Sequence, residues 1–515
     1  MQHTSKQVSG NRFVRYARRV RLAVYGWLDR PAFFYVLVGL LVFQALWIAL
    51  TARYPQAFDE NYHFGLIQLH ATQWLPYFTA HIPGAEVYGA ITRDPSYLYH
   101  FIFSLPYRLL TTFTDSLAIQ VIALRMGNIA LFVGGLFVYR KVLAELGLSR
   151  RLIHVVLLFF VLTPIMPLLA AQINYDNLIF LLTGLLFLYA VRLLQQLDRS
   201  GTISVVNLLW VVFYMLLTSI VKYTSTPLSL GLALVLAAVL GWRYYQRRLA
   251  APALQWPRRS VLILLGLAVL ILGGLFAERY GTNLVRYGHP VPDCGLVLTT
   301  EQCMAYSPWA RDHLYADTYP KPTAWGVLVY PGVWVHRMVF ETMFTISSRF
   351  DYDGVTVVYI PAPPLTVANY TAWTIVTVGA VLTLMFWKRL WRQRYLRWLL
   401  LAIGFYTAVL FAKNLSMYLH TGEAMAIHGR YLIPVYPVLY AALALVFGWA
   451  LERNKRPELK TWLVIATLVL LIHGAGLVVW IFRSDPSWYW SRAADAFVYQ
   501  VNRPVQQIIH RIIIP

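Results

Sequence analysis

The strongest constraint on this sequence is a series of apolar runs, each long enough to cross a bilayer as one helix. An apolar helix of about 20 residues spans the hydrocarbon core, where backbone polar groups must be satisfied within the protein. The composition agrees, because 59% of the 515 residues are hydrophobic and only 13% are charged. The sequence therefore predicts an all-α polytopic membrane protein with about eleven transmembrane helices. The runs lie at 32–51, 118–139, 152–171, 176–192, 204–221, 227–242, 260–277, 369–387, 398–415, 431–451 and 461–482.

The formal net charge of +22 raises the question of a nucleic-acid partner, but the distribution of this charge points to a membrane. When the chain is divided at the ends of the apolar runs, all of the excess positive charge falls on the side of the N-terminus, and the other side is close to neutral. Short cytoplasmic loops carry such an excess of Lys and Arg. We therefore expect a cytoplasmic N-terminus, an external C-terminus and no nucleic-acid partner.

This division gives three regions. Residues 1–30 are basic, with apolar residues at helical spacing, as in a helix that lies on an anionic cytoplasmic leaflet. No cleavable signal peptide is expected, because the first apolar run has the length of a span. Residues 31–482 are expected to form the transmembrane domain, with amphipathic helices in two large external loops at about 52–117 and 278–368. Residues 483–515 are expected to form a short external tail.

An acidic motif directly follows the first apolar run. Asp59, Glu60 and His63 lie within the stretch 58–63, where the chain leaves the membrane. Carboxylates next to hydrocarbon are unfavourable unless water, a partner or a substrate stabilises them. We therefore predict that Asp59 and Glu60 are catalytic and that His63 orients the substrate. Asp94, which opens a second amphipathic helix in the same loop, is a further substrate-orienting candidate.

Two further charged residues lie at the external ends of predicted spans. Asp176 opens the span 176–192, where it fits either a helix cap or a substrate-facing acid, and we include it among the catalytic candidates. Lys222 follows the span 204–221, where its ammonium either snorkels to the interface or pairs with an acidic ligand. The sequence leaves both alternatives open.

An arginine enters the span 431–451 from the outside, against the charge trend of the chain. The side chain of Arg430 is a planar, permanently charged fork that suits a phosphate. The alternative is a snorkelling side chain with a local carboxylate partner such as Glu423. We favour the phosphate, and we include His428 as a second candidate ligand for it.

The second external loop contains both cysteines of the chain, Cys294 and Cys303. On the oxidising side of a bacterial membrane we expect them to form a disulfide, which would contribute about 2–3 kcal/mol by closing a small ring. The alternative is a metal site that also uses His289 and His313, although the spacing matches no usual zinc pattern. Later in the same loop, the stretch 347–354 is expected to be an ordinary loop.

Together these motifs resemble the GT-C superfamily of integral membrane glycosyltransferases. Members of this superfamily follow the first span with a long external loop that carries an Asp-Glu or Asp-Asp pair, which Asp59 and Glu60 match. An acidic position in the next external loop matches Asp176, and a Gly-Arg-Tyr-Leu-x-Pro element matches residues 429–434. The protein mannosyltransferase and lipid A aminoarabinose transferase branches are reasonable models. Because no sizeable soluble C-terminal domain is expected, acceptor recognition would come from the external loops.

The resemblance implies an enzyme that moves a sugar from a polyprenyl-phosphate carrier to a cell-envelope acceptor, with inversion at the anomeric carbon. Asp59 would deprotonate the acceptor hydroxyl. Arg430, Lys222 and His428 would stabilise the departing phosphate. The acceptor would be a lipid, a glycan or a protein, and the expected location is a bacterial inner membrane with the active site facing the periplasm.

The remaining polar residues of the motifs would support this chemistry. Glu60, His63 and Asp176 would orient the acceptor or hold a divalent ion. Some branches of the superfamily need a metal and others do not, so Mg²⁺ or Mn²⁺ remains an open alternative here.

A transporter or flippase for a lipid-linked sugar is the alternative from another functional class. Such proteins usually contain internal repeats or charged residues near the middle of their spans, whereas the charges of this sequence cluster at external span ends. An O-antigen polymerase or ligase would share the membrane setting but should use diphosphate-linked donors. A non-catalytic assembly protein is the last interpretation.

Overall fold

The structure, a computed structural model, is mostly helical. It describes residues 26–56, 59–246, 253–342, 350–352, 357–359, 365–452 and 489–513, together with residues 19, 22, 23 and 467. Among these residues, seven helices are long and apolar enough to cross a membrane. They are Ala32–Thr51, Leu117–Glu145, Asp176–Ser200, Tyr223–Gln246, Arg259–Tyr287, Leu396–Thr421 and Gly429–Glu452.

These helices coincide with predicted spans, but the predicted number of spans is not reached in the described part of the chain. Two further predicted spans correspond to shorter apolar helices, Val205–Val221 and Tyr370–Met385. The predicted span 461–482 lies outside the described residues, apart from residue 467. The basic segment 1–30 also lies largely outside them.

The predicted span 152–171 is broken into two helices, which corrects the sequence-based expectation of one. α6 ends at Leu162, and the short helix α7 begins at Ile165. Pro164 has no backbone N–H and disfavours a helical conformation in the residue before it. Thr163 accordingly has an extended backbone, with ψ of 123°.

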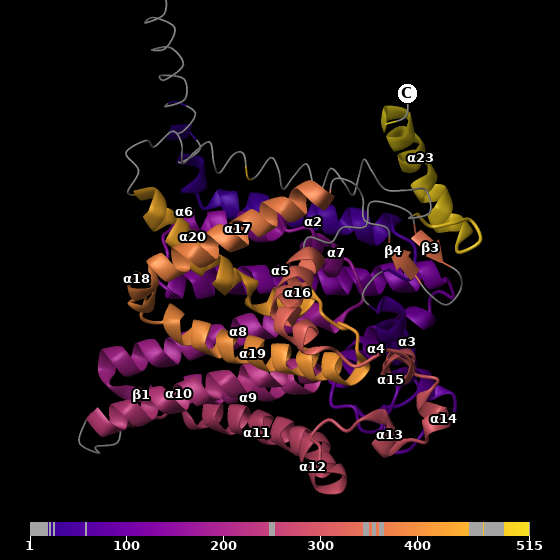
Figure 1. The fold of residues 1–515 in the computed structure, drawn as a ribbon, viewed down its shortest axis with the longest axis horizontal. Helices are drawn as coiled ribbons and strands as arrows, with labels where there is room; N and C mark the ends of the chain where they lie inside the picture. The colour runs from indigo at the N-terminus through magenta and orange to yellow at the C-terminus, as the bar shows by residue number, and fades with distance from the viewer. Residues whose placement is uncertain are drawn as a thin grey trace, which may run out of the picture.

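The long helices form a bundle in which they run roughly along the long axis of the molecule (Figure 1). The bundle contains α2 (Ala32–Thr51), α5 (Leu117–Glu145), α6 (Arg150–Leu162), α7 (Ile165–Ala170), α8 (Tyr175–Ser200), α9 (Val205–Val221), α10 (Thr226–Gln246), α11 (Arg259–Phe276), α17 (Leu365–Met385), α19 (Leu396–Thr421) and α20 (Tyr436–Glu452). α8 is its centre, because 78% of its span is buried within the protein, against 11% for the span that includes α11. Small residues allow this packing: a Cβ at Gly135 of α5 would lie 2.3 Å from a ring carbon of Phe180 on α8.

One end of the bundle, which we call the site end, is covered by short helices from the two predicted external loops (Figure 1). These are α3 (Glu60–His70), η1 (Ala85–Tyr88), α4 (Leu98–Thr111), η3 (Ala277–Gly281), α12 (Thr282–Tyr287), α13 (Cys294–Val297), α14 (Thr300–Cys303) and α15 (Ser307–Thr318). The C-terminal segment with α23 (Ala496–Ile513) also packs here, because the backbone N–H of Trp490 donates to the carbonyl of Thr51 at 3.3 Å.

The rest of the second loop contains a helix and a pair of short strands. The helix α16 (Ala324–Thr342) packs against α17, α19 and η4 (Gly429–Val435) of the bundle. Within the stretch 347–354, which was expected to be an ordinary loop, the described residues form strand β3 (Phe350–Tyr352), which pairs antiparallel with β4 (Val357–Tyr359).

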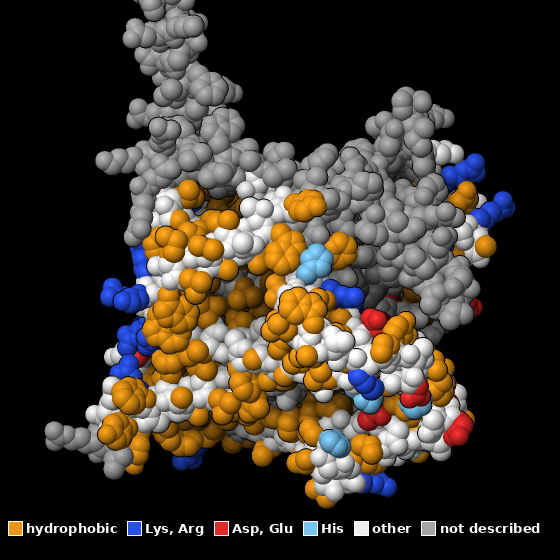
Figure 2. Space-filling view, in the orientation of Figure 1, with side chains coloured by type: hydrophobic (Ala, Val, Ile, Leu, Met, Phe, Trp, Pro, Cys, Tyr) orange, Lys and Arg blue, Asp and Glu red, His pale blue; other side chains and the backbone are white. Residues whose placement is uncertain are grey.

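The opposite end of the bundle, which we call the basic end, carries the connections between spans. It includes the parallel pair of β1 (Thr202–Ser204) and β2 (Ala253–Gln255), and the short helix α18 (Trp387–Trp391). Figure 2 shows Lys and Arg side chains gathered near α18, an apolar surface along the bundle, and most of the visible Asp and Glu side chains toward the site end. This separation of charge along the bundle axis agrees with the distribution in the sequence.

Candidate functional site

Asp59 and Glu60 are neighbours in sequence, but their side chains reach different environments. Asp59 has a left-handed backbone conformation, with φ of 68°, immediately before α3 begins at Glu60. This conformation is uncommon outside glycine, and Asp is one of the residues that tolerate it. The Asp59 side chain is 59% exposed, whereas the Glu60 side chain is completely buried. Phe58, which precedes the pair in the motif, lies outside the described residues.

Glu60 forms a buried ion pair with Arg125 of α5. Nε and Nη2 of Arg125 each donate to one carboxylate oxygen of Glu60 at 2.8 Å. The backbone N–H groups of Gln56 and Ile173 donate to the same carboxylate at 2.7 and 3.2 Å, and Nη1 of Arg125 donates to the carbonyl of Ala52 at 2.6 Å. Both carboxylate oxygens are therefore engaged by the protein. This geometry ties α3 to α2 and α5 through Glu60 and favours a structural role for it. The catalytic role of Glu60 stays a prediction.

Arg430 lies directly opposite Asp59. Its Nη2 donates to Oδ2 of Asp59 at 2.7 Å, and its backbone N–H donates to Nδ1 of His428 at 3.0 Å. The carboxylate partner of Arg430 is thus Asp59 and not Glu423, the local partner considered from sequence. Desolvation raises the pKa of Asp59, but the charge and hydrogen bond of Arg430 outweigh it and hold that pKa below its ordinary value. Asp59 is therefore a carboxylate at neutral pH.

A second ion pair joins Lys222 to Asp176. Nζ of Lys222 donates to Oδ1 of Asp176, and both side chains are almost fully buried. This burial is incompatible with a snorkelling lysine. The N-cap of α8 is Asn174, whose side chain accepts from the backbone N–H of Asp176 at 2.9 Å. Asp176 is therefore not the cap that the sequence suggested as one alternative. It lies in the first turn of α8, where the helix dipole favours a carboxylate.

Two tyrosines lie against Lys222, and one of them, Tyr431, also connects it to Arg430. Nζ of Lys222 lies 4.5 Å from the ring centroid of Tyr175 and 4.9 Å from that of Tyr431, within cation–π range. Tyr431 directly follows Arg430, whose guanidinium carbon lies 5.6 Å from its ring centroid. A small, largely enclosed cavity lined in part by Asp176, Lys222 and Tyr431 has room for about one water molecule. The site is therefore a compact network of alternating charges and aromatic rings.

His63 lies beside this network, in a chain of hydrogen-bonded histidines. Its Nδ1 is 3.0 Å from Nε2 of His100, and Nδ1 of His100 is 3.1 Å from the carbonyl oxygen of Ser96. A carbonyl only accepts, so Nδ1 of His100 carries its proton, Nε2 accepts, and Nδ1 of His63 donates. Burial lowers the pKa of both histidines well below the ordinary value, so both are neutral at pH 7. The network thus assigns the lone pair of His63 to Nε2, on a ring whose centroid lies 4.4 Å from that of Tyr175.

Asp94 shapes the loop next to the site. Its Oδ1 accepts the backbone N–H of Ser96 at 2.8 Å, and burial raises its pKa above the ordinary value. Oγ of Ser96 in turn accepts the backbone N–H of Tyr223, the residue after Lys222, at 2.9 Å. Asp94 is thus connected to the site through one intervening residue.

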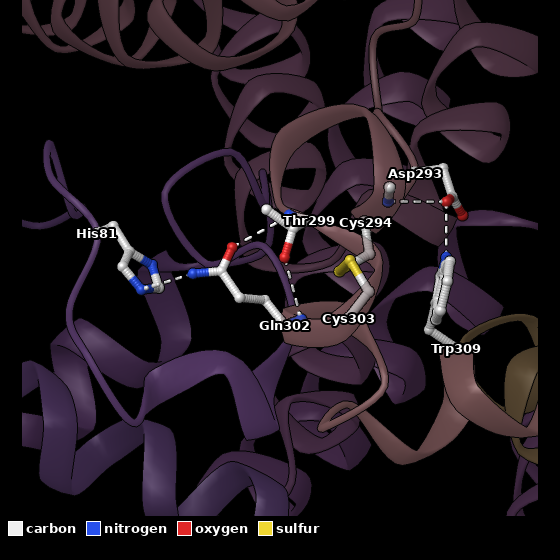
Figure 3. The surroundings of a disulfide bond; sticks show 8 residues. His81, Asp293, Cys294, Thr299, Gln302, Cys303 and Trp309 are labelled. Atoms are coloured by element: carbon white, nitrogen blue, oxygen red, sulfur yellow. Dashed lines mark hydrogen bonds between the residues drawn. A yellow bond between two sulfur atoms is a disulfide. The ribbon is translucent and has the colours of Figure 1, made fainter.

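The disulfide predicted from sequence is present between Cys294 and Cys303 (Figure 3). α14 begins with a capping box, in which Thr299 and Gln302 exchange hydrogen bonds between side chain and backbone. Nε2 of Gln302 also lies 3.5 Å from Nε2 of His81, which belongs to the first external loop. The disulfide therefore stabilises a segment that connects the two loops.

This segment also delivers an aromatic residue to the site. The backbone N–H of Tyr306 donates to the carbonyl of Cys303 at 3.0 Å. The Tyr306 ring packs so closely on Gly89 that a Cβ at position 89 would lie 3.0 Å from a ring carbon. Its ring centroid lies 6.3 Å from that of Tyr62, on the first turn of α3. The second loop therefore closes over the first beside the acidic motif.

The carboxylates of the predicted motifs are engaged by cationic side chains in this structure. Asp59, Glu60 and Asp176 are each paired with an Arg or Lys side chain, whereas Mg²⁺ and Mn²⁺ need carboxylate oxygens that are open to the ion. The metal alternative with His289 and His313 also loses its sulfur ligands, because both cysteines are in the disulfide. In the described part of the chain, no group of at least three His, Cys, Asp or Glu residues is arranged to hold an ion.

Sequence reasoning missed two cations at this end of the bundle. Arg125 is the buried partner of Glu60. Lys413 of α19 reaches Tyr223, with Nζ 3.4 Å from the phenol oxygen and 5.0 Å from the ring centroid. Both lie inside predicted apolar spans, where a charged side chain is costly and usually has a specific partner or function. That signal could have identified them.

Comparison with known proteins gives no assignment. No protein-family model, curated protein or solved structure matches this chain. Its function is therefore inferred from the geometry of the site. The structure joins Asp59 with Arg430 and Asp176 with Lys222, and it separates Glu60 from both pairs.

Proposed function

We propose that this protein is an inverting membrane glycosyltransferase of the GT-C type, which transfers a sugar from a polyprenyl-phosphate carrier to a cell-envelope acceptor. The observation that carries the proposal is the Asp59–Arg430 pair, in which an accessible carboxylate lies 2.7 Å from a guanidinium at one end of an apolar bundle. Sugar transfer from a lipid phosphate needs these two groups: a base for the acceptor hydroxyl and a cation for the departing phosphate.

The base in this proposal is Asp59. Its exposed side chain is open to an incoming hydroxyl, unlike the buried carboxylates of Glu60 and Asp176. Its lowered pKa keeps it ionised at neutral pH. A carboxylate that is ion-paired is a weak base, so Asp59 becomes an effective base only when Arg430 turns to another anion.

The phosphate ligand in this proposal is Arg430, with Lys222 and Lys413 as further cations. An arginine fork binds phosphate through parallel charged hydrogen bonds. Lys222 and Lys413 contact Tyr431 and Tyr223, respectively, so their charges lie on neighbouring aromatic faces. We propose that the donor phosphate takes the place of Asp59 as the partner of Arg430, which frees the carboxylate for catalysis.

The transfer step then involves one bond formed and one bond broken at the anomeric carbon. The acceptor oxygen attacks this carbon from the side opposite the phosphate, and its proton passes to Asp59. The bond between the anomeric carbon and the phosphate oxygen breaks, and the phosphate leaves with the electron pair, stabilised by Arg430. Attack from the opposite side inverts the configuration of the sugar. His63 would accept a hydrogen bond from a substrate hydroxyl through Nε2.

The proposed setting is a bacterial inner membrane with the site end facing the periplasm. Two observations support this orientation: the basic residues gather at the other end of the bundle (Figure 2), and the site end contains a disulfide, which persists in oxidising compartments. A polyprenyl tail would lie in the membrane beside the apolar bundle, with its phosphate at the level of Arg430.

A transporter or flippase for the same lipid-linked sugar is the alternative function. The observation in its favour is the Lys222–Asp176 pair, which is almost fully buried between bundle helices, as charged residues on transport pathways often are. Against it, the charges of the site lie at helix ends, whereas transporters bind their substrate near the middle of the membrane.

The test is a donor assay with the purified protein in nanodiscs and a panel of polyprenyl-phosphate sugars, with a cell-envelope lipid extract as the source of acceptor. Release of free polyprenyl phosphate, with the sugar recovered on an acceptor, is the expected result. EDTA should leave this release unchanged, because the carboxylates are already paired with cations. If the protein moves the intact donor across liposomes without releasing phosphate, the flippase alternative is correct and the transferase proposal is wrong.

A further inference from the structure

A second charged site lies at the basic end of the bundle, opposite the end that holds the candidate active site. It is a shallow pocket between the end of α17, α18 and the end of α20. Its lining residues are Met385, Phe386, Lys388, Arg389, Arg392, Trp449 and Glu452. We propose that this pocket binds the headgroup of an anionic phospholipid, with the acyl chains along α17.

The charge of the pocket suits an anion. It contains the cations Lys388, Arg389 and Arg392 and a single carboxylate, Glu452. Glu452 is engaged by Arg389, whose Nη1 and Nη2 donate to it at 3.3 and 3.2 Å. In the described part of the chain, Lys388 and Arg392 have no carboxylate partner, and both side chains are exposed. The pocket therefore retains an excess of two positive charges for an anionic ligand.

The floor of the pocket is rigid and aromatic. The guanidinium carbon of Arg389 lies 4.5 Å from the ring centroid of Trp449, within cation–π range. Trp449 and Phe386 are buried, and their ring centroids lie 6.1 Å apart. Arg389 is held by this floor and by Glu452, so the position of one of the three cations is set before a ligand arrives. A preformed site loses less conformational entropy on binding.

The surroundings favour a lipid over a free anion. The pocket opens beside the last turns of α17, where the exposed fractions of Val381, Leu384 and Met385 are 52%, 78% and 64%. These apolar side chains continue the surface that faces the bilayer in the proposed arrangement. Trp387 and Trp391, whose ring centroids lie 5.0 Å apart on α18, are typical of the membrane interface. A ligand with an anionic head and apolar chains satisfies both halves of this surface, and basic pockets at membrane helix ends bind such lipids.

This inference does not rest on the proposed transferase function, because it uses different residues at the opposite end of the bundle. The proposal does not depend on which side of the membrane the basic end faces. Anionic phospholipids occur in membrane leaflets, and the pocket needs only a lipid headgroup at the same depth. The shared chemistry is an anionic phosphate group, and inorganic phosphate is the competing source of that group.

The experiment measures bound phosphatidylglycerol by native mass spectrometry of the full chain released from detergent, with phosphatidylcholine as the neutral comparison. The variant K388Q/R392Q removes the two cations that lack a carboxylate partner. The control K141Q/R258Q makes the same charge change at the same end of the bundle but outside the pocket lining. We expect about 30-fold weaker binding of phosphatidylglycerol to K388Q/R392Q and wild-type binding to the control, since each cation near a lipid headgroup contributes about 1 kcal/mol.

Two further probes, inorganic phosphate and glycerophosphoglycerol, separate the headgroup from the intact lipid. Thermal unfolding of the wild type should shift upward with phosphatidylglycerol and should not shift with either soluble anion. Equal retention of phosphatidylglycerol by the wild type and K388Q/R392Q would overturn the proposal, as would an equal loss in the control. A thermal shift with inorganic phosphate as large as that with the lipid would identify a simple anion site and would also overturn it.

Discussion

Arg430 and Asp59 are 371 positions apart in the chain, and they meet through a hydrogen bond of 2.7 Å. This contact joins the loop after the first span to the turn that opens the last described span. It pairs the most accessible carboxylate of the site with the cation best suited to a phosphate. Each partner therefore blocks the other until a competing anion separates them.

Replacing Arg430 by Lys should weaken donor binding while preserving the charge. A lysine cannot reproduce the planar fork, so at least one charged hydrogen bond to the phosphate is lost. We expect a loss of about 1.5–3 kcal/mol, or roughly a tenfold to hundredfold weaker donor affinity, measured by titration of a polyprenyl-phosphate sugar. Arg503→Lys, on α23, makes the same change away from the site and should bind as the wild type does. Unchanged donor affinity in Arg430→Lys would remove Arg430 from the phosphate site.

Replacing Glu60 by Gln should destabilise the protein. The change leaves the Arg125 guanidinium buried without its counter-ion, and such changes cost about 3–5 kcal/mol. The measurement is the midpoint of thermal unfolding in detergent, compared with Asp59→Asn. Because Asp59 is exposed and Asn keeps a hydrogen-bond acceptor for Arg430, this substitution should lower the unfolding midpoint less than Glu60→Gln does. If Glu60→Gln unfolds at the wild-type temperature, the structural role assigned to Glu60 is wrong.

The stability of the site end should fall as the pH falls below about 6.5. Burial, followed by the charges of Arg279 and Arg108, lowers the pKa of His70 to about 3 in the folded protein. Between these two values the unfolded chain binds the proton and the folded chain does not, so the free energy of unfolding decreases as pH decreases. For His70 alone the loss between pH 7 and pH 5 is about 2 kcal/mol.

The matched variant for this prediction is His70→Phe. The His70 ring packs against Phe78, with 4.5 Å between the ring centroids and 43° between the ring planes, and its Nδ1 is buried without a hydrogen-bond partner. An apolar ring is therefore expected to fit. The variant should lose part of the pH dependence of the unfolding midpoint and keep the part that comes from His63 and His100. An identical pH profile in the variant and the wild type would contradict the buried neutral state of His70.

Removing the disulfide should loosen Tyr306 more than the bundle. The double change Cys294→Ser and Cys303→Ser opens a ring with a sequence separation of 9, which should cost about 2–3 kcal/mol. The backbone of Tyr306 hydrogen-bonds to the backbone of Cys303, so loss of the disulfide should loosen Tyr306. We therefore expect a higher KM for the acceptor and an unchanged affinity for the donor. Steady-state titration of acceptor and donor distinguishes the two. A donor affinity that falls as much as the acceptor affinity would contradict this division of roles.

The sequence predicted most of the long apolar helices and the residues that meet at one end of the bundle. It did not predict where all the helices end, because α5 continues to Glu145 and α8 to Ser200. Asp59, Asp176, Lys222 and Arg430 could be placed together because each lies at the end of an apolar run that the charge distribution predicts to be external. The sequence could not say which cation pairs with which acid. Arg430 pairs with Asp59, which lies near the other end of the chain. Glu423, the partner considered from the sequence, is close to Arg430 in the sequence but does not pair with it.

Two features of the structure were not predicted from the sequence, for local backbone reasons. Asp59 and Glu60 are adjacent, but the left-handed backbone at Asp59 sends the two side chains apart, toward solvent and toward Arg125. The break at Pro164 was hidden by the continuous apolar character of the run 152–171, although the proline itself was a visible signal. Hydropathy reports which residues avoid water, and it does not report where the backbone hydrogen bonds end.

The most direct test of the account is the turnover of a polyprenyl-phosphate sugar by Asp59→Asn and by the wild type, both in nanodiscs. Asparagine keeps the shape and a hydrogen-bond acceptor for Arg430 but cannot take a proton at neutral pH. We expect the variant to remain folded at the assay temperature and to lose turnover by a factor of about 10²–10⁴, the usual contribution of a general base. A folded Asp59→Asn protein that releases polyprenyl phosphate at the wild-type rate would contradict the role of Asp59 as the catalytic base.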